Sequence, residues 1–590
     1  MQYYSMCGCF MRKFKVAEAA PPDDVAEAFR RYAVGRIDME ASQLAAFLRE
    51  WQEVGENEAE AEADKVVVEV ARRRRLHLHI ANKLGGGGGD GGGSVTKKGL
   101  TIEDFFYYLF STDLNPPLVD KVHQDMTKPL SHYYIYTGHN SYLTGNQLNS
   151  NCSDRPIVKA LKRGVRVIEL DLWPNKKQVL VKHGGTLTTP VDLLRCLKSI
   201  KEYAFVASPY PVVITLEDHL PPELQSKVAK MLTETFGDMI YTPKTESLEE
   251  LPSPEQLQYR VIVSTKPPKE YLKSGSVKIK DSDDETSADG PLNQTLLPQD
   301  DAGSNVSDSF EESDEESHHV GLLAYKRLIA IHAGKPKGGL REALKVDPCK
   351  VRRLSLSEQT LEKAAEHHGT DTIRFTQKNV LRIYPKGSRV TSSNYKPLIG
   401  WMHGAQMVAF NMQGYGKSLW LMHGMFRANG GCGYVLKPEF LMNAGPDGEV
   451  FNPKAHLPPK RTLKVKIYMG DGWHLDFPLT HFDWCSPPDF YVRVGIAGVK
   501  NDTIMKQTKT KNNKWTPVWN EEFAFPLACP ELALLRLEVR EDDLGGNHDF
   551  GGQTCLPVSE LRPGIRSLPL YDRKGDKYRS VRLLVRFEFA

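Results

Sequence analysis

Polar residues between His132 and Glu217 fall at the ends of short apolar segments. Four segments share this pattern: HYYIYTGHN, VRVIELDLW, QVLVKHGG and PVVITLEDH. Each is rich in Val, Ile, Leu or Tyr and has the length of a strand, so each predicts a buried strand with polar residues at its C-terminal end. Helix-like stretches such as RPIVKALKRG lie between them. Strands that alternate with helices indicate a parallel sheet covered by helices.

The residues at these strand ends have the chemistry of a metal site. Glu169 and Asp171 lie two positions apart, so both side chains leave the same face of one strand. Asn140 and Glu217 end two other segments. In a parallel α/β barrel the C-terminal edge of the strands is where chemistry is done. Three carboxylates and an amide there suit a hard cation with oxygen ligands, such as Ca²⁺ or Mg²⁺.

Two histidines complete the candidate site. His139 precedes Asn140, and His183 ends the third segment. Beside a divalent cation, two imidazoles suit proton transfer and charge stabilisation in phosphoryl chemistry. The alternative is that each polar residue is simply solvated at a strand end, but six such residues on four successive segments weaken that explanation. The pattern therefore predicts a metal-assisted phosphodiesterase.

The N-terminal region, residues 1–120, is predicted to be helical. Its segment GRIDMEASQLAAFLREWQ is similar to the exit of an EF-hand. Placing Gly35 at position 6 of the calcium loop puts Arg30, Tyr32 and Val34 where acidic ligands are needed. We therefore expect this hand not to bind calcium.

An acidic segment interrupts the α/β region. Residues 270–320 are rich in Asp, Glu and Ser and poor in aromatic residues, so they cannot bury enough apolar surface to fold and are predicted to be disordered. The α/β pattern occupies residues 125–269 before this linker and resumes over residues 321–440, with short strands such as NVLRIYP.

The last region, residues 459–590, alternates apolar and polar residues in segments divided by turns, which predicts an antiparallel β-sandwich. Acidic residues gather in two of its loops. The first loop holds Asp483 and Asp489, and the second holds Glu541, Asp543 and Asp549. Carboxylates at one end of a sandwich suit a calcium-dependent site for lipid headgroups, whereas the alternative is that these loop acids are only solvated.

Composition limits the classes of function. A chain of 590 residues has room for three or four domains. Its net charge of +3 gives no argument for nucleic acid as a partner. We find no run of about 18 apolar residues that would span a membrane. Nine scattered cysteines do not suggest a disulfide framework, which favours the cytosol.

Long motifs resemble one enzyme family. LSHYYIYTGHNSYLTGNQL, VRVIELDLWP and ASPYPVVITLEDH are similar to the X region of the eukaryotic phosphoinositide-specific phospholipases C. SSNYKPLIGWMHGAQMVAFNMQG and NGGCGYVLKPEF are similar to their Y region, and the terminal segment resembles a C2 domain. The resemblance covers about four fifths of the chain and is strongest to the short form typical of plants. It implies a TIM barrel split into an X half and a Y half, EF-hand-like helices before it and a C2 domain after it.

The resemblance also implies residue roles. It makes Asn140, Glu169, Asp171 and Glu217 calcium ligands, and it makes His139 and His183 catalytic. The family binds the headgroup through positions that match Lys266, Ser355, Arg382 and Tyr384 here. Its usual second lysine is replaced by Pro268, and Lys269 follows as the substitute.

The implied activity is calcium-dependent hydrolysis of phosphatidylinositol 4,5-bisphosphate to inositol 1,4,5-trisphosphate and diacylglycerol. Either Glu169 or Glu217 would be the base. The implied partners are calcium ions and a phosphoinositide membrane surface, with the protein in the cytoplasm and at the inner face of the plasma membrane. Two other readings remain: a glycerophosphodiester phosphodiesterase, which would not need the headgroup residues, and an inactive lipid-binding scaffold, which would be expected to have lost catalytic residues.

Overall fold

The protein is described by a computed structural model. It covers residues 3–6, 12–15, 20–33, 37–84, 99–245, 248–268, 321–334, 338–483, 486–542 and 548–590. The chain forms two compact units. The barrel unit comprises His123–Leu419 and Gly431–Asn452, and the sandwich unit comprises Met1–Val122, Trp420–Gly430 and Pro453–Ala590. None of the described helices is long and apolar enough to cross a membrane. Lys269, Asp543 and the whole of the predicted acidic linker, 270–320, lie outside the described residues.

Eight described strands of the barrel unit run parallel to their neighbours. They are β3 (Tyr133–Ile135), β4 (Val167–Asn175), β7 (Val212–Asp218), β8 (Val261–Thr265), β9 (Ile329–His332), β10 (Arg353–Ser357), β11 (Val380–Tyr384) and β12 (Met407–Val408). Parallel bridges from Thr137 to Val167, from Ala333 to Arg353 and from Gly138 to Phe410 join the remaining edges. The strands therefore close into a barrel, and the predicted fold, a TIM barrel interrupted by the linker between β8 and β9, is confirmed.

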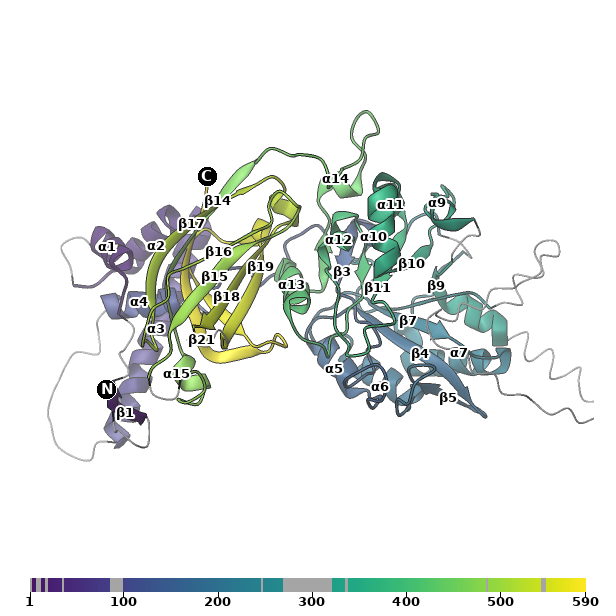
Figure 1. Cartoon of the computed structure of the whole chain (residues 1–590), viewed down its shortest axis with the longest axis horizontal. Coiled ribbons are helices and arrows are strands. Elements are labelled where there is room, and N and C mark those ends of the chain that lie inside the picture. The colour runs from purple at the N-terminus through teal and green to yellow at the C-terminus, as the bar shows by residue number, and fades with distance from the viewer. Residues whose placement is uncertain are drawn as a thin grey trace, which may run out of the picture. The chain divides into compact units, whose positions relative to one another are not determined.

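Helices cover the outside of this barrel (Figure 1). The main ones are α5 (Arg155–Lys162), α6 (Leu193–Tyr203), α7 (Pro222–Phe236), α10 (Glu358–His367) and α11 (Gly369–Lys378). Helix α5 shows why they form: Ile157, Ala160 and Leu161 share one face and are buried, and the chain leaves the helix at Gly164, whose φ of 97° suits glycine. Shorter elements are β6 (Val191–Asp192), α9 (Gly339–Ala343), α12 (Leu398–Met402), β13 (Tyr434–Leu436) and α14 (Glu439–Met442).

One segment that was predicted to be a barrel strand forms a strand outside the barrel. The segment QVLVKHGG forms β5 (Gln178–Val181), which pairs antiparallel with the end of β4 and is not one of the eight barrel strands. Strand β4 has nine residues; Val167–Leu172 pair with β7, and the rest extend into a hairpin with β5. The turn uses Lys176 at a φ of 52°. This hairpin returns the chain toward the C-terminal edge of the barrel, so His183 arrives there by a different route from the one predicted.

The sandwich unit contains eight described antiparallel strands in the order β16-β15-β18-β19-β20-β21-β14-β17. Strands β19 and β20 share only the pair Gln553 and Tyr571, so the sheet folds over at that point and apolar side chains fill the space between its halves. The strand bounds are β14 Arg461–Asp471, β15 Phe490–Ala497, β16 Ile504–Gln507, β17 Val518–Leu527, β18 Leu534–Glu541, β19 Phe550–Pro557, β20 Gly564–Tyr571 and β21 Lys577–Phe589. The predicted C-terminal sandwich is confirmed.

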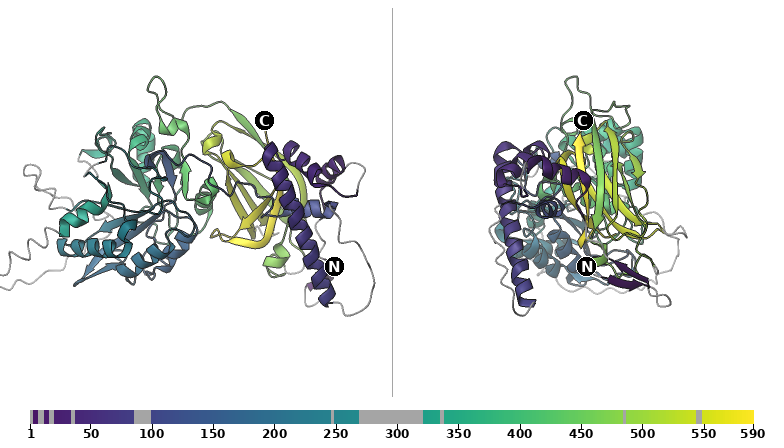
Figure 2. Two further views of the ribbon diagram at one scale, coloured as in Figure 1. Left: turned by 180° about the vertical axis from the view of Figure 1, so that it is seen from behind. Right: turned by 90° about the vertical axis from the view of Figure 1, so that its left-hand side faces the viewer.

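The N-terminal helices share a core with this sandwich. They are α1 (Asp23–Tyr32), α2 (Ala41–Glu50), the long α3 (Glu56–Leu84) and α4 (Ile102–Phe110), and Figure 2 shows α3 running beside the strands. Tyr468 and Leu584 of the sandwich belong to the same buried cluster as the helices' apolar faces. Tyr32, at a predicted EF-hand ligand position, is buried and donates a hydrogen bond to Glu50 (2.5 Å). Gly35 lies outside the described residues.

The remaining elements are the hairpin of β1 (Tyr3–Met6) and β2 (Arg12–Lys15), helix α13 (Lys417–Met425) and the short helix α15 (Trp473–Asp476).

Candidate active site

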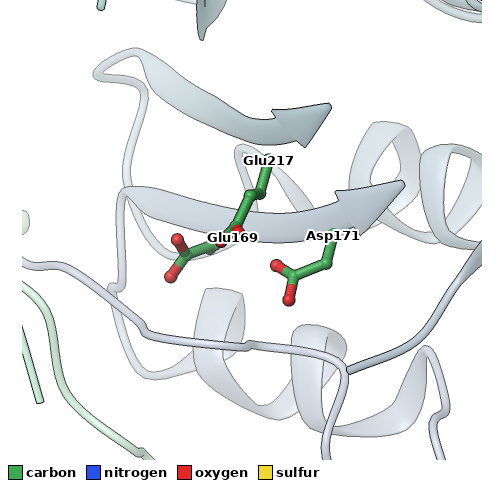
Figure 3. A group of neighbouring side chains, drawn as sticks. All are labelled: Glu169, Asp171 and Glu217. Atoms are coloured by element: carbon green, nitrogen blue, oxygen red, sulfur yellow. The ribbon is translucent and has the colours of Figure 1, made fainter. Parts of the chain in front are cut away.

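Three carboxylates meet at the C-terminal edge of the barrel (Figure 3). Glu169 and Asp171 leave the same side of β4, and Glu217 comes from β7, where it lies opposite Asp171 in the parallel register. One oxygen of each lies within 4.8 Å of the others. Within the described ranges, this is the one group of acidic, histidine or cysteine side chains with the spacing of metal ligands. Glu169 and Asp171 are buried, whereas Glu217 is exposed.

The negative charge of this group is only partly balanced. Asp171 Oδ2 accepts a hydrogen bond from Tyr142 (2.7 Å), but Asp171 Oδ1 is buried and has no partner. Burial, followed by the charges of Glu217 and Glu169, raises the pKa of Asp171 well above its usual range. A buried oxygen without a partner costs free energy, and a hard divalent cation would satisfy it. The donor set therefore fits a calcium ion.

The other two carboxylates each have a cationic or polar neighbour. Arg382, on β11, donates a hydrogen bond to Glu169 Oε1, and the backbone N–H of Asn140 donates to Glu169 Oε2 (3.3 Å). His219 bonds Glu217 through Nε2 (3.2 Å), and this hydrogen bond lowers the pKa of Glu217. Among these three acids, Glu169 is bonded to an arginine, and the buried Arg353 adds a second positive charge near Glu169 and Glu217.

Asn140 follows the barrel strand β3 in a left-handed backbone conformation. Its φ is 42°, which Asn tolerates better than most residues, and its side chain is buried. Strained conformations of this kind are common at functional sites. The turn directs the Asn140 backbone N–H to Glu169, so the predicted fourth ligand lies beside the carboxylates.

Both predicted catalytic histidines are held through Nδ1. His139 Nδ1 lies 3.0 Å from Asn411 Oδ1, and burial lowers the pKa of His139. His183 Nδ1 lies 2.7 Å from the backbone oxygen of Gln147. A carbonyl oxygen only accepts, so His183 Nδ1 carries a hydrogen. In each ring Nε2 is then the nitrogen left for chemistry.

Two predicted headgroup residues lie on adjacent strands. Ser355 of β10 pairs with Arg382 of β11 in the parallel register, and the Arg382 guanidinium lies 5.3 Å from the centre of the Tyr384 ring. Arg382 is buried, and its bond to Glu169 was not predicted. Lys266 is exposed directly after β8, and Lys269 lies outside the described residues.

Several polar residues around this site escaped the sequence analysis. Tyr142, Gln147 and Asn411 all touch a predicted ligand or histidine. A weak signal existed for each, because Tyr142 and Gln147 closely follow the His139–Asn140 pair and Asn411 follows an apolar segment. Arg353 was also missed. It lies two residues before Ser355 on the same face of β10, is buried, and has no partner at Nε or Nη1.

The sandwich loops bring part of their predicted set together. The backbone N–H of Asp542 donates to the backbone oxygen of Asp489 (2.9 Å), and the backbone N–H of Glu541 donates to the backbone oxygen of Asp549 (2.9 Å), so these two loops meet at one end. Asp483 accepts a hydrogen bond from Ser486 (2.9 Å). Asp543 lies outside the described residues.

Comparison with known proteins adds independent findings. The chain matches the X domain of phosphatidylinositol-specific phospholipase C over residues 126–267, the Y domain over residues 339–440 and the C2 domain over residues 461–572. It is 58% identical to phosphoinositide phospholipase C 4 of Arabidopsis thaliana, across 100% of this chain and 99% of that protein. It is 32% identical to 1-phosphatidylinositol 4,5-bisphosphate phosphodiesterase delta-3 of Mus musculus, across 94% of this chain and 66% of that one. The crystal structure of L. pealei PLC21 superposes with a TM-score of 0.69 at 25% identity, across 96% of this chain and 68% of that chain.

Proposed function

The chain belongs to the phosphoinositide phospholipase C family, and from this premise we propose that it hydrolyses phosphatidylinositol 4,5-bisphosphate to inositol 1,4,5-trisphosphate and diacylglycerol in a calcium-dependent reaction. The observation that carries the proposal is the group formed by Glu169, Asp171 and Glu217 beside two histidines held through Nδ1. This arrangement supports an acid–base reaction on a phosphodiester, with residues that would hold a divalent cation beside it.

Asn140, Glu169, Asp171 and Glu217 would hold the calcium ion. When bound, the cation lowers the pKa of the inositol 2-hydroxyl and stabilises negative charge on the phosphoryl group. Either Glu169 or Glu217 accepts the proton of that hydroxyl as it attacks phosphorus. Glu217 is the more exposed of the two, whereas Glu169 is bonded to Arg382.

The histidines act through Nε2. Protonated at Nε2 as well as at Nδ1, His139 supports the charge of the pentacoordinate phosphorus, and His183 gives a proton to the departing diacylglycerol oxygen. Its Nδ1–H donates to the Gln147 carbonyl, which orients the ring so that Nε2 can carry this proton. Water then opens the cyclic inositol phosphate.

Five residues are proposed to bind the headgroup: Lys266, Lys269, Ser355, Arg382 and Tyr384. Lysine and arginine suit the ring phosphates, and the Tyr384 ring can pack on the inositol. The adjacent positions of Ser355 and Arg382 on the barrel strands support this assignment.

The sandwich domain is proposed to bind calcium and the membrane through Asp483, Asp489, Glu541, Asp543 and Asp549, which would place the enzyme at the cytoplasmic face of the plasma membrane. The meeting of the Asp489, Glu541 and Asp549 segments supports this assignment. The proposed domain limits are 1–120 for the helices, 125–269 for the X half, 270–320 for the linker, 321–440 for the Y half and 459–590 for the C2 domain.

One assay tests the proposed activity. The full chain is incubated with vesicles that contain phosphatidylinositol 4,5-bisphosphate over a series of free calcium concentrations, and inositol phosphates and diacylglycerol are measured. We expect calcium-dependent release of both products. Cleavage of soluble glycerophosphodiesters in preference to the vesicles would instead support a glycerophosphodiester phosphodiesterase. Vesicle binding without any product would support an inactive scaffold.

A further inference from the structure

Gln147 joins several parts of the candidate active site through its side chain and its backbone oxygen. It is buried, and it lies on the loop after β3. Its Oε1 accepts a hydrogen bond from Asn140 Nδ2 (3.0 Å), and its Nε2 donates to Asn411 Oδ1 (3.1 Å). Its backbone oxygen accepts from His183 Nδ1 (2.7 Å). One residue thus touches a proposed metal ligand, a proposed catalytic histidine and the partner of the other histidine.

The direction of each bond follows from backbone carbonyl groups, which only accept. Asn411 Nδ2 donates to the backbone oxygen of Ser393 (3.3 Å), so Asn411 Oδ1 is an acceptor. That oxygen receives the His139 Nδ1–H as well as the Gln147 Nε2–H. The orientation of the Asn411 amide therefore sets both the His139 tautomer and the orientation of Gln147.

The same assignment of hydrogen-bond directions extends to the proposed metal ligand Asn140. With Nε2 of Gln147 directed at Asn411, its Oε1 faces Asn140 and takes the Asn140 Nδ2–H. Asn140 Oδ1 is then the amide atom that accepts no hydrogen bond from any described residue. This oxygen is the one that a hard cation needs. A flipped Asn140 would present N–H groups to the cation instead.

Ser392, beside this network, also orients the side-chain amide of Gln147. Ser392 Oγ donates to the backbone oxygen of Gly145 (2.7 Å), so it is left to accept from Gln147 Nε2 (2.8 Å). Ser392 and Asn411 belong to the Y half, whereas Asn140 and His183 belong to the X half. The orientation of the site therefore depends on side chains from both halves of the barrel.

We propose that Gln147 is a positioning residue, which directs Asn140 Oδ1 toward the calcium site and links the two histidines into one hydrogen-bonded network. This inference rests on the proposed function of the site. Glutamate at position 147 has the same shape, but it cannot donate to Asn411 Oδ1 or to Ser392. Its charge would repel the Asn411 oxygen and move the side chain away from the place where it accepts from Asn140, so the Asn140 amide would lose its hold. Loss of an outer hydrogen bond to a metal ligand commonly costs about 10–100-fold in affinity or activity.

Gln413 provides a matched control. Its Nε2 donates to Gly145 (3.2 Å) and to Ser392 Oγ (3.2 Å), so it joins the same two loops. It touches none of the proposed ligands or histidines. Any loosening of the contact between the two halves should appear in Gln413→Glu as much as in Gln147→Glu.

The test compares Gln147→Glu with Gln413→Glu in the full chain. Melting temperature with chelator reports folding, and titration calorimetry with calcium reports binding. The heat that disappears in Asp171→Asn identifies the barrel site and excludes calcium bound elsewhere. Turnover is measured on vesicles that contain phosphatidylinositol 4,5-bisphosphate. We expect Gln147→Glu to lose about 10–100-fold in turnover and to bind calcium more weakly at the barrel site, with Gln413→Glu near the wild type.

Equal behaviour of the two variants would overturn the proposal, because Gln147 would then be only a structural link. If Glu at position 147 prevents folding, the neutral pair Gln147→Met and Gln413→Met replaces the first pair with the same expectation. A wild-type chain that cleaves no phosphoinositide at any calcium concentration would reject the proposed function itself. A wild-type chain that cleaves normally, with a folded Gln147 variant that is equally active, would reject only the role of Gln147.

Discussion

Two buried carboxylates on strands, Glu538 of the sandwich and Asp171 of the barrel, have opposite surroundings. Glu538 is fully buried, and Arg540 Nε lies 2.7 Å from its Oε1 while Arg536 Nη2 lies 3.1 Å from its Oε2. Asp171 is 4% exposed. One of its oxygens accepts a hydrogen bond from the Tyr142 hydroxyl, the other has no partner, and two further carboxylates lie beside it.

The difference lies in where the positive charge comes from. A buried charge is tolerated when it is paired and hydrogen-bonded, and two arginines of the same strand, β18, provide this for Glu538. The barrel group has one arginine bond for three acids. A bound cation would supply the partner that the buried Asp171 Oδ1 lacks. Burial alone therefore does not identify a functional acid, whereas the balance of charge around it does.

The largest effect should come from the histidines next to the barrel carboxylates. We expect His139→Ala and His183→Ala each to lower turnover by about 10²–10⁴-fold, the usual range for a positioned acid or base. Vesicle hydrolysis at saturating calcium measures the loss, and the melting temperature verifies folding. A variant with near-normal turnover would remove that histidine from the mechanism.

The sandwich carboxylate should matter for stability instead. Glu538→Gln leaves arginines without their counter-charge, so we expect a loss of up to about 3–5 kcal/mol in the free energy of unfolding, with unchanged turnover at a temperature where the variant is folded. Denaturant unfolding measures it.

Glu588→Gln is the control on the same sheet. Glu588 bonds Lys464 (2.7 Å), but both side chains are more than one third exposed, so only about 0–1 kcal/mol should be lost. Equal losses at the two positions would show that burial does not distinguish these ion pairs.

Removing an acid from the barrel group should have the reverse effect on stability. Without calcium, Asp171→Asn relieves repulsion among carboxylates that lie within 4.8 Å of one another, so the variant should be at least as stable as the wild type. A ligand at 100 times its Kd stabilises by about 2.7 kcal/mol, and the variant should lose this barrel contribution. Melting temperatures with chelator and with calcium measure both. A variant that calcium stabilises as strongly as the wild type would place the ion elsewhere.

The arginine of the barrel group should also select the substrate. Arg382→Ala should reduce hydrolysis of phosphatidylinositol 4,5-bisphosphate more than that of phosphatidylinositol, because only the first lipid has a ring phosphate for the guanidinium to bind. The difference in transition-state stabilisation should equal that of a hydrogen bond to a charged group, about 1.5–3 kcal/mol. The ratio of kcat/KM for the two lipids measures this difference and cancels the loss of the Glu169 contact. Arg389→Ala, which removes an arginine bonded to Glu358 (2.8 Å), should affect both lipids alike. An unchanged ratio for Arg382→Ala would limit Arg382 to balancing Glu169.

The sequence was sufficient for the elements that depend on local pattern. Strand-length apolar segments with polar ends predicted the barrel strands, and alternation predicted the sandwich, because side-chain period and turn chemistry act over a few residues. The spacing of Glu169 and Asp171 placed both on one face of β4, as the structure has them. Local pattern could not give strand direction, so β5 was assigned to the barrel when it is a hairpin partner of β4.

Only the tertiary structure decided the contacts between residues that lie far apart in the chain. Arg382 reaches Glu169 across 213 positions, and Gln147 reaches Asn411 across 264. Neither residue type nor spacing specifies such a partner, because the barrel closes only when strands on both sides of the linker pair. The sequence by itself predicted which residues would carry the chemistry. The closed barrel decided which nitrogen, oxygen or charge each of them presents, since those are set by hydrogen-bond partners supplied from the opposite half.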